Sequence, residues 1–308
     1  MGFGSLLSQE FKNLTNGHFS SEKTLFTKLE DAFIHLSSIC SIKYHVDYAV
    51  DIIHGTKSHV DFKYNGTYIG SITPPQIRRK ELADLMFIVF SPRKREIRLT
   101  YMQNKKGATS YQSFKADLLQ LYLLKNRPEI DSPTLPICVF GDRRILSDAR
   151  LPSVGSYGVF YKDISCNTIE MSYFPASNLL PRKPIGGVQR TVKAVESLGT
   201  ITVNGYNESQ GEATLTAFGD ALISMTIGTP MNDDCETLGK MCAFLNKNSK
   251  VFSAADFPLF NQYYEDQEID SFKPQDSFPT IVVINADRFD NFNEAVAEAE
   301  NGFDGWGE

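Results

Sequence analysis

The chain has 308 residues, of which 42% are apolar and 22% charged, and a formal net charge of −6. This composition is that of a globular protein with room for one large domain or two smaller ones, and it excludes an intrinsically disordered chain. No apolar run reaches the 18 residues of a membrane helix, and the N-terminal segment lacks the basic and apolar regions of a secretory signal. Five scattered cysteines without a CxxC pair argue against a disulfide framework. We therefore expect a cytoplasmic protein without a membrane partner.

The charge is distributed unevenly. Residues 254–308 carry 13 acidic and 2 basic side chains, so the rest of the chain has a net charge of +5. Nine bases lie between residues 76 and 106, namely Arg78, Arg79, Lys80, Arg93, Lys94, Arg95, Arg98, Lys105 and Lys106. Such a patch indicates an anionic partner, with a solvated pair of surface strands as the equal alternative. The acidic stretch could mask this patch or mimic nucleic acid, and a solubilising tail is the simpler interpretation.

The first half of the chain alternates helical and extended patterns. Leu25, Leu29, Phe33 and Leu36 recur at three- and four-residue steps and predict a helix over residues 21–40. Residues 44–53 and 59–70 are expected to be extended, the second with a hairpin turn at Asn65-Gly66. The pattern then predicts strands at 82–90 and 96–104, a helix at 113–124 and a strand at 135–140.

The second half has strand patterns at 157–163 and 168–174. Helices are predicted at 189–198, 217–228 and 235–246, followed by a strand at 278–285 and a helix at 292–300. Together the elements predict an α/β fold with a mixed central sheet and flanking helices. We place a domain boundary near residue 150, which separates a core at 1–150 from a C-terminal α+β region at 151–308.

The strongest chemical signal lies on the hairpin formed by the strands at 82–90 and 96–104. Asp84 stands near the start of one strand, and Gln103 and Lys105 near the end of its neighbour. In an antiparallel pair these ends lie side by side, and residues two apart point to the same face. A carboxylate and an amide oxygen suit Mg²⁺, which binds few protein oxygens and keeps several waters. A nearby ammonium can stabilise the charge that develops on a phosphate.

This arrangement resembles the PD-(D/E)xK nuclease superfamily, whose core is a helix, a hairpin with Asp and then (Glu/Gln)xLys, and a further helix. The resemblance covers roughly residues 20–140, with Ala83 in place of the usual Pro and Gln103 in place of the usual Glu, as in the QxK branch. It implies a restriction-endonuclease-like core, catalytic roles for Asp84, Gln103 and Lys105, and Mg²⁺ or Mn²⁺ held by Asp84 and Gln103.

Two further acids, Glu22 and Glu81, are candidates for the same site. The superfamily's first helix often supplies an acid, and Glu22 falls within the apolar stripe of the predicted helix, whereas Glu30 sits at its edge. Alternatively, the helix begins after Glu22, which is then only a favourable first-turn acid. Glu81 reaches the site only if the chain bends between it and Asp84. His54 and His59 have no matching cluster of ligands, so we do not expect a histidine metal site.

The function that follows is a metal-dependent DNA endonuclease, of the kind used in prokaryotic restriction or antiviral defence. Arg78, Arg79, Lys80, Arg93, Lys94, Arg95 and Lys106 are its expected nucleic-acid contacts. Protein partner subunits or a homo-oligomer are compatible with this role. The alternative is a nucleic-acid-binding or assembly subunit that keeps the fold without cleavage. A third possibility is an interaction protein in which the hairpin charges do no chemistry.

Overall fold

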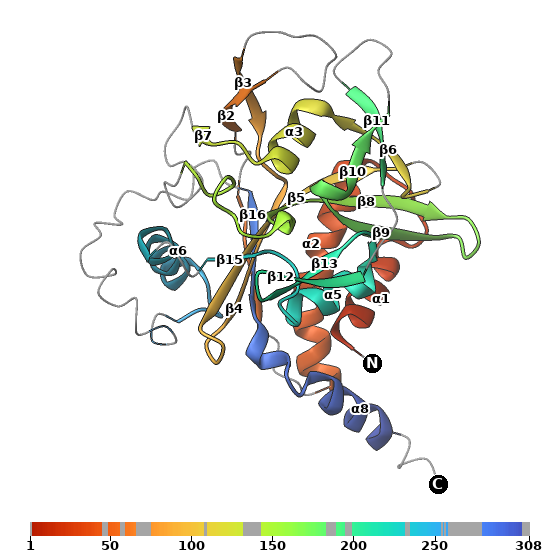
Figure 1. The fold of residues 1–308 in the computed structure, drawn as a ribbon. Coiled ribbons are helices and arrows are strands. Elements are labelled where there is room, and N and C mark those ends of the chain that lie inside the picture. Colours follow the sequence, from red (N-terminus) through yellow and green to blue (C-terminus); the bar gives the residue numbers. More distant parts are fainter. Residues whose placement is uncertain are drawn as a thin grey trace.

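The computed structural model describes residues 2–44, 49–55, 59–65, 75–107, 110–131, 143–182, 189–194, 199–231, 235–253, 255, 257 and 279–303. A mixed sheet of eight strands forms its centre, with helices on both faces (Figure 1). These strands are β1 (Val50–Ile53), β4 (Leu85–Ser91), β5 (Glu96–Lys106), β8 (Gly155–Asp163), β9 (Thr168–Pro175), β14 (Ala213–Thr214), β15 (Thr229–Pro230) and β16 (Thr280–Asn285). The predicted α/β class with a mixed central sheet is confirmed.

The strand order is β1-β16-β4-β5-β8-β9-β14, and β15 pairs with the start of β5. β16 runs parallel to β4 and β5 parallel to β8, while the other neighbours are antiparallel. β4 and β5 form the predicted hairpin, with Leu85 opposite Met102 and Ser91 opposite Glu96. Arg95 closes the turn with a left-handed φ of 53°. The sequence prediction of this hairpin is therefore confirmed.

Alternate side chains of β4 enter two separate cores, because both faces of the sheet are covered. Leu85 and Phe87 face the layer of α1 (Phe3–Thr15), α2 (Glu22–Ile39), α5 (Leu215–Ile223) and α8 (Phe292–Phe303). Met86 and Ile88 face the layer that contains α3 (Leu118–Asn126) and α6 (Cys235–Asn248). A strand that is buried on both sides is apolar throughout, which explains the continuous apolar run of β4.

Three smaller sheets complete the fold. One has the order β3-β2-β7, with β2 (His59–Tyr64), β3 (Gln76–Glu81) and β7 (Ile130–Asp131); a second has the order β10-β11-β6, with β6 (Ser113–Asp117), β10 (Leu179–Pro181) and β11 (Gln189–Ala194); the third pairs β12 (Gly199–Val203) with β13 (Tyr206–Gln210). The first two flank α3 above the central sheet in Figure 1. β3 ends directly before the hairpin that carries Asp84, so this small sheet borders the predicted site.

Two of the predicted helices are wrong in part. Within residues 113–124, the chain forms β6 up to Asp117 and only then α3, because Phe114 and Ala116 alternate with period two and Asp117 caps the helix. Residues 189–194 are β11, paired with β6, whereas residues 195–198 lie outside the described residues. In both segments, pairing with a distant strand overrides the local helical pattern.

Other elements differ from the prediction in extent. The helix α1 was not expected, and α2 continues as a π-helical turn at Cys40–Tyr44, so that β1 begins only at Val50. β2 ends at Tyr64 and pairs with β3 from Gln76, whereas Gly66 of the predicted turn lies outside the described residues. The predicted strand at 135–140 also lies outside them.

The remaining predicted helices and strands of the second half are present as β8, β9, α5, α6, β16 and α8. The domain boundary near residue 150 stays a prediction, and the central sheet draws strands from both sides of it, since β8 pairs with β5. Among the described residues, no helix is long and apolar enough to span a bilayer.

Two glycines allow α1 and α5 to touch through their backbones. A Cβ added at Gly4 would lie 1.9 Å from the backbone oxygen of Thr216, and one added at Gly219 would lie 2.7 Å from Cα of Gly4. The amide of Gly4 also donates to Asp220 Oδ1 at 2.9 Å. The close packing of α1 against α5 therefore depends on the absence of side chains at Gly4 and Gly219.

We predict that Gly4→Ala lowers the free energy of unfolding by about 2–3 kcal/mol, because the added methyl group forces the helices apart. Equilibrium unfolding in urea measures this change. Ala217→Ser, at an exposed position of α5, serves as the control and should leave stability within about 0.5 kcal/mol of the original. A Gly4→Ala protein as stable as the original would show that the two helices do not pack this closely.

Candidate functional site

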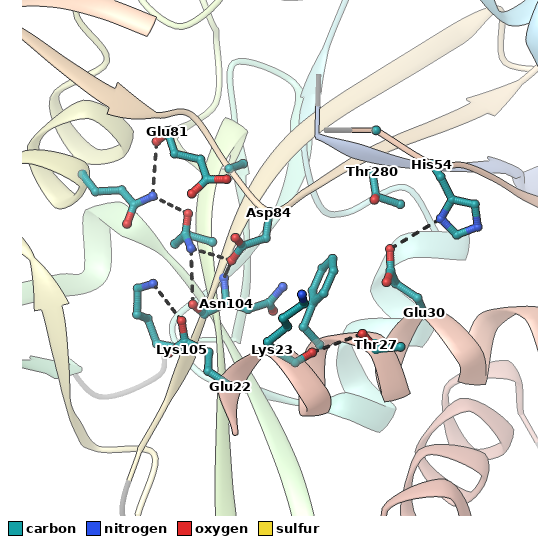
Figure 2. Close-up of a pocket in the computed structure, with 15 residues that line it drawn as sticks. Glu22, Lys23, Thr27, Glu30, His54, Glu81, Asp84, Asn104, Lys105 and Thr280 are labelled. Atoms are coloured by element: carbon teal, nitrogen blue, oxygen red, sulfur yellow. Dashed lines mark hydrogen bonds and ion pairs between the residues drawn. The ribbon is translucent and has the colours of Figure 1, made fainter. Parts of the chain in front are cut away.

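The predicted catalytic side chains line one pocket of about 670 Å³ at the end of the β4–β5 hairpin (Figure 2). Asp84, Gln103 and Lys105 come from this hairpin, and Glu22 comes from the first turn of α2. Glu81 lines the pocket as well, because residues 82 and 83 interrupt the strand between β3 and β4. The structure thus brings together the four residues predicted from the sequence. The chain also leaves the strand between Glu81 and Asp84, which is the condition under which Glu81 was expected to reach the site.

Asp84 is held by the neighbouring strand. Its Oδ2 accepts hydrogen bonds from Nε2 of Gln103 at 2.5 Å and from the backbone amide of Asn104 at 2.7 Å. The amide of Asp84 donates in turn to the carbonyl of Met102 at 3.2 Å. The other carboxylate oxygen, Oδ1, has no hydrogen-bond partner among the described residues. One oxygen therefore fixes the side chain, and the other is available to a ligand.

A residue that the sequence left without a role fixes the orientation of Gln103. Nε2 of Gln120, on α3, donates to Oε1 of Gln103 and to the carbonyl of Glu81 at 3.2 Å. Gln120 occupies this position because Oδ1 of Asp117 caps α3, accepting from the amides of Leu119 and Gln120. The chain of contacts from Asp117 through Gln120 to Gln103 ends at Asp84.

Glu22 joins α2 to the end of β5. Ser21 caps the helix, so Glu22 is its first residue, and the carboxylate reaches across to the sheet. Its Oε1 lies 3.3 Å from Nζ of Lys105, and its Oε2 accepts from the amide of Lys106 at 3.0 Å. Glu22 thereby holds Lys105 at the pocket, and it is both a first-turn acid and a residue of the site.

Burial raises the pKa of Asp84 from 3.8 to about 6. The positive charge of Lys105 and the amide of Asn104 oppose this rise, whereas the carboxylates of Glu81 and Glu22 add to it. The carboxylate is therefore costly to ionise in the protein alone, as is common for a group that serves a bound cation or a reaction.

The opposite wall of the pocket carries a second polar cluster. Glu30 of α2 is only 8% exposed, and its carboxylate lies 4.0 Å from Nδ1 of His54, with Thr280 beside them (Figure 2). Burial raises the pKa of Glu30, while a hydrogen bond from Thr280 lowers it. The sequence placed Glu30 only at the edge of the apolar stripe, and no local signal connects Thr280 to the site.

Asn104, between Gln103 and Lys105, contributes a buried amide to the same strand end. Its side chain is fully buried, and neither Oδ1 nor Nδ2 has a hydrogen-bond partner in the described structure. It occupies the space left by Gly158 of β8, where a Cβ would lie 2.7 Å from Oδ1 of Asn104. Unpaired buried amides are uncommon, and they concentrate at functional sites or beside water.

The predicted nucleic-acid contacts fall into two separate places. Arg78, Arg79 and Lys80 lie on β3, which leads into the pocket; Arg79 pairs with Asp61 and Lys80 with Asp117. Lys106 follows Lys105, with its ammonium 4.1 Å from the ring centre of Phe19.

The turn with Arg93, Lys94 and Arg95 lies at the other end of the hairpin. The seven residues of β4 separate it from Asp84, a distance of about 20 Å. Arg93 pairs with Asp290, and its amide donates to Asp287 at 2.8 Å. Acidic residues of the C-terminal stretch therefore contact this basic turn. Masking of the basic patch by this stretch was one of the alternatives that the sequence left open.

The donors fit a hydrated divalent cation better than a fully protein-bound one. Within the described parts of the chain, no three His, Cys, Asp or Glu side chains are close enough to hold a metal by themselves. Asp84 offers a free oxygen, and Gln103 offers an amide oxygen after rotation of its side chain. Mg²⁺ commonly takes one or two protein ligands and completes its shell with water and phosphate, so the residues are compatible with it.

Comparisons with protein-family models, with curated proteins and with solved structures find no match to this chain.

We predict that Asp84→Asn stabilises the metal-free protein at pH 7.5 by up to about 3 kcal/mol. The folded-state pKa of Asp84, about 6, lies above its ordinary value of 3.8, so the folded protein loses stability as the pH rises between these values. The gain from Asp84→Asn should therefore vanish below about pH 4. Urea unfolding in EDTA across this range measures it.

The exposed carboxylate of Asp148 provides the matched control, and Asp148→Asn should change stability little at any pH. A gain from Asp84→Asn that persisted unchanged at pH 3 would show that ionisation of Asp84 is not its cause.

Proposed function

We propose that this chain is a metal-dependent DNA endonuclease whose active site is the pocket around Asp84. The observation that carries the proposal is the convergence of Asp84, Gln103 and Lys105 on that pocket, joined by Glu22 from the first helix. These are the residue types, in the order and on the elements, that the resemblance to PD-(D/E)xK nucleases requires.

The reaction is hydrolysis of a phosphodiester. The oxygen of a water molecule attacks phosphorus, the bond to the leaving oxygen breaks, and a proton passes to that oxygen. Lys105 stabilises the negative charge that develops on the phosphate, and Glu22 keeps its ammonium in place. Asp84 and Gln103 are the residues that would hold Mg²⁺ or Mn²⁺, which supplies further positive charge and makes bound water more acidic.

The biological setting that we propose is prokaryotic restriction or antiviral defence, where endonucleases with this type of site act on foreign DNA. Partner subunits or self-association are part of this proposal. The need for partner subunits would be tested by comparing cleavage by the isolated chain with cleavage in the presence of proteins with which it co-purifies.

A nucleic-acid-binding subunit without catalysis is the second candidate, and one observation favours it. Nε2 of Gln103, rather than its oxygen, faces Asp84, and Gln120 holds that orientation. Binding of a metal through the amide oxygen of Gln103 therefore requires this amide to turn over and Gln120 to present its oxygen in place of its nitrogen. A chain that never makes this exchange would bind DNA without cutting it.

We predict that the protein nicks plasmid DNA in Mg²⁺ or Mn²⁺ and that Asp84→Asn and Lys105→Ala each reduce the rate by at least about 100-fold. Asp84→Asn should retain DNA binding, because it removes a charge that repels phosphate. Gln103→Glu should remain active at lower metal concentration, since it adds a carboxylate. Asp148→Asn is the control and should cleave normally.

Metal binding has its own readout, the shift in melting temperature on addition of Mg²⁺ or Mn²⁺, which Asp84→Asn should abolish. If neither the original chain nor Gln103→Glu cuts DNA but both bind it, the second candidate is correct. If Asp84→Asn cuts as fast as the original, the active site lies elsewhere.

We also predict that β3 contacts the DNA backbone. Arg78 is exposed and three residues from Glu81, about 10 Å along the strand, and it has no acidic partner among the described residues. Arg78→Gln should therefore reduce the slope of log affinity against log salt by about one. Lys247→Gln, at an exposed site on α6, should leave the slope unchanged. An unaltered slope in Arg78→Gln would place the DNA on another surface.

A further inference from the structure

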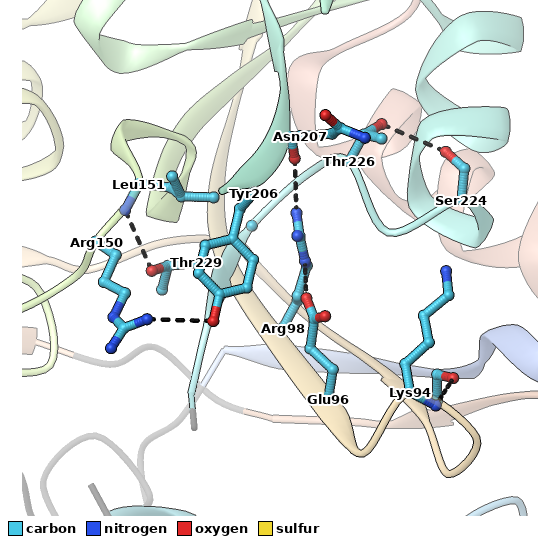
Figure 3. A network of polar contacts seen from close by, with 12 residues as sticks. Lys94, Glu96, Arg98, Arg150, Leu151, Tyr206, Asn207, Ser224, Thr226 and Thr229 are labelled. Atoms are coloured by element: carbon cyan, nitrogen blue, oxygen red, sulfur yellow. Dashed lines mark hydrogen bonds and ion pairs between the residues drawn. The ribbon is translucent and has the colours of Figure 1, made fainter. Parts of the chain in front are cut away.

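A second pocket, of about 260 Å³, lies at the turn end of the β4–β5 hairpin, away from Asp84. Three segments that are distant in sequence form it: the hairpin with Lys94, Glu96 and Arg98, the start of β13 with Tyr206 and Asn207, and the turn after α5 with Ser224 and Thr226 (Figure 3). None of these side chains takes part in the site around Asp84.

The pocket contains a buried guanidinium. Arg98 is only 4% exposed, its Nε donates to Glu96 at 2.5 Å, and its Nη1 donates to the carbonyl of Asn207 at 3.0 Å. A guanidinium has five N–H donors, and the contacts of Arg98 with described residues use only these two nitrogens. Nη2 of Arg98 therefore has no hydrogen-bond partner among the described residues.

Further groups around Arg98 suit an anion. Lys94 extends from the hairpin beside it, and no carboxylate among the described residues pairs with its ammonium (Figure 3). The ring of Tyr206 lies between the guanidinium groups of Arg98 and Arg150, 5.6 and 5.7 Å from its centre. Among the residues that line the pocket, the positive charges of Lys94 and Arg98 exceed the single negative charge of Glu96. The pocket therefore keeps a net positive charge although one acid lines it.

The hydroxyl groups on the opposite wall add polar contacts of the right kind. Ser224 and Thr226 stand 3.3 Å apart, oxygen to oxygen, on the turn that faces the hairpin. A guanidinium with an unused nitrogen, an ammonium without a carboxylate partner and two hydroxyl groups, which also contact the carbonyl of Ala221 at 3.3 Å, together match a group with several charged oxygens arranged around one centre. We propose that this pocket binds the phosphate of a phosphate ester, either a nucleic-acid strand or a free nucleotide.

The test measures binding of three probes at low salt by isothermal titration calorimetry: inorganic phosphate, a nucleoside 5′-monophosphate and a short single-stranded oligodeoxynucleotide. Lys94→Gln should weaken binding of the phosphate esters about tenfold, because it removes one charge-assisted contact. The double variant Arg98→Gln/Glu96→Gln should abolish binding of phosphate and of the mononucleotide, and remove the Lys94-dependent part of oligonucleotide binding, while keeping the buried pair neutral and hydrogen-bonded. Lys247→Gln should bind as the original does.

The probes separate the two sources of phosphate. Lys94-dependent binding of the mononucleotide indicates a free nucleotide, whereas Lys94-dependent binding of the oligonucleotide alone indicates a strand. Asp84→Asn should bind normally in either case, so the result is independent of any nuclease activity. The proposal is overturned if no probe binds the original protein, or if Lys94→Gln and the double variant bind as tightly as the original.

Discussion

A carboxylate placed at the end of a covered sheet must be held by nearby donors, and most features of the Asp84 pocket follow from this requirement. Asn104 and Gln103 satisfy one oxygen of Asp84, Gln120 fixes Gln103, and Asp117 fixes the helix that carries Gln120. Gln120 also donates to the carbonyl of Glu81, so β3, β5 and α3 are tied together around one charge. The price is a folded state in which that charge is unfavourable unless a cation accompanies it.

The same pocket shows how two layers of the protein cooperate. The hairpin supplies Asp84 and Lys105 from the sheet, while α2 supplies Glu22 to one wall and Glu30 to the other. The two acids are eight residues apart on one helix, so a movement of α2 would alter the position of Lys105 and the surroundings of Glu30 together.

The sequence predicted those features of the fold and site that are determined by residues close together in the chain. The β4–β5 hairpin has a short turn and alternating or fully apolar strands, so its antiparallel pairing and the meeting of Asp84 with Gln103 could be anticipated. Residues 113–117 and 189–194 were misassigned because each becomes a strand by pairing with the other, across some 75 residues of chain. Thr280 and Arg98 acquire contacts from segments far along the chain, and Gln120 from strands 17 and 39 residues before it. No local pattern records these contacts.

The position of β16 has a consequence for how the chain is made. This strand lies between β1 and β4, yet each of its residues stands 195 positions after its partner in β4, as Thr280 does after Leu85. During synthesis, the edge of β4 that pairs with β16 therefore stays without this partner until residues 280–285 have left the ribosome. Contacts of such long range also slow folding in general. The nascent protein thus carries an apolar, pairing-competent strand edge while the residues between β4 and β16 are made, and this edge is open to pairing with other chains during that time.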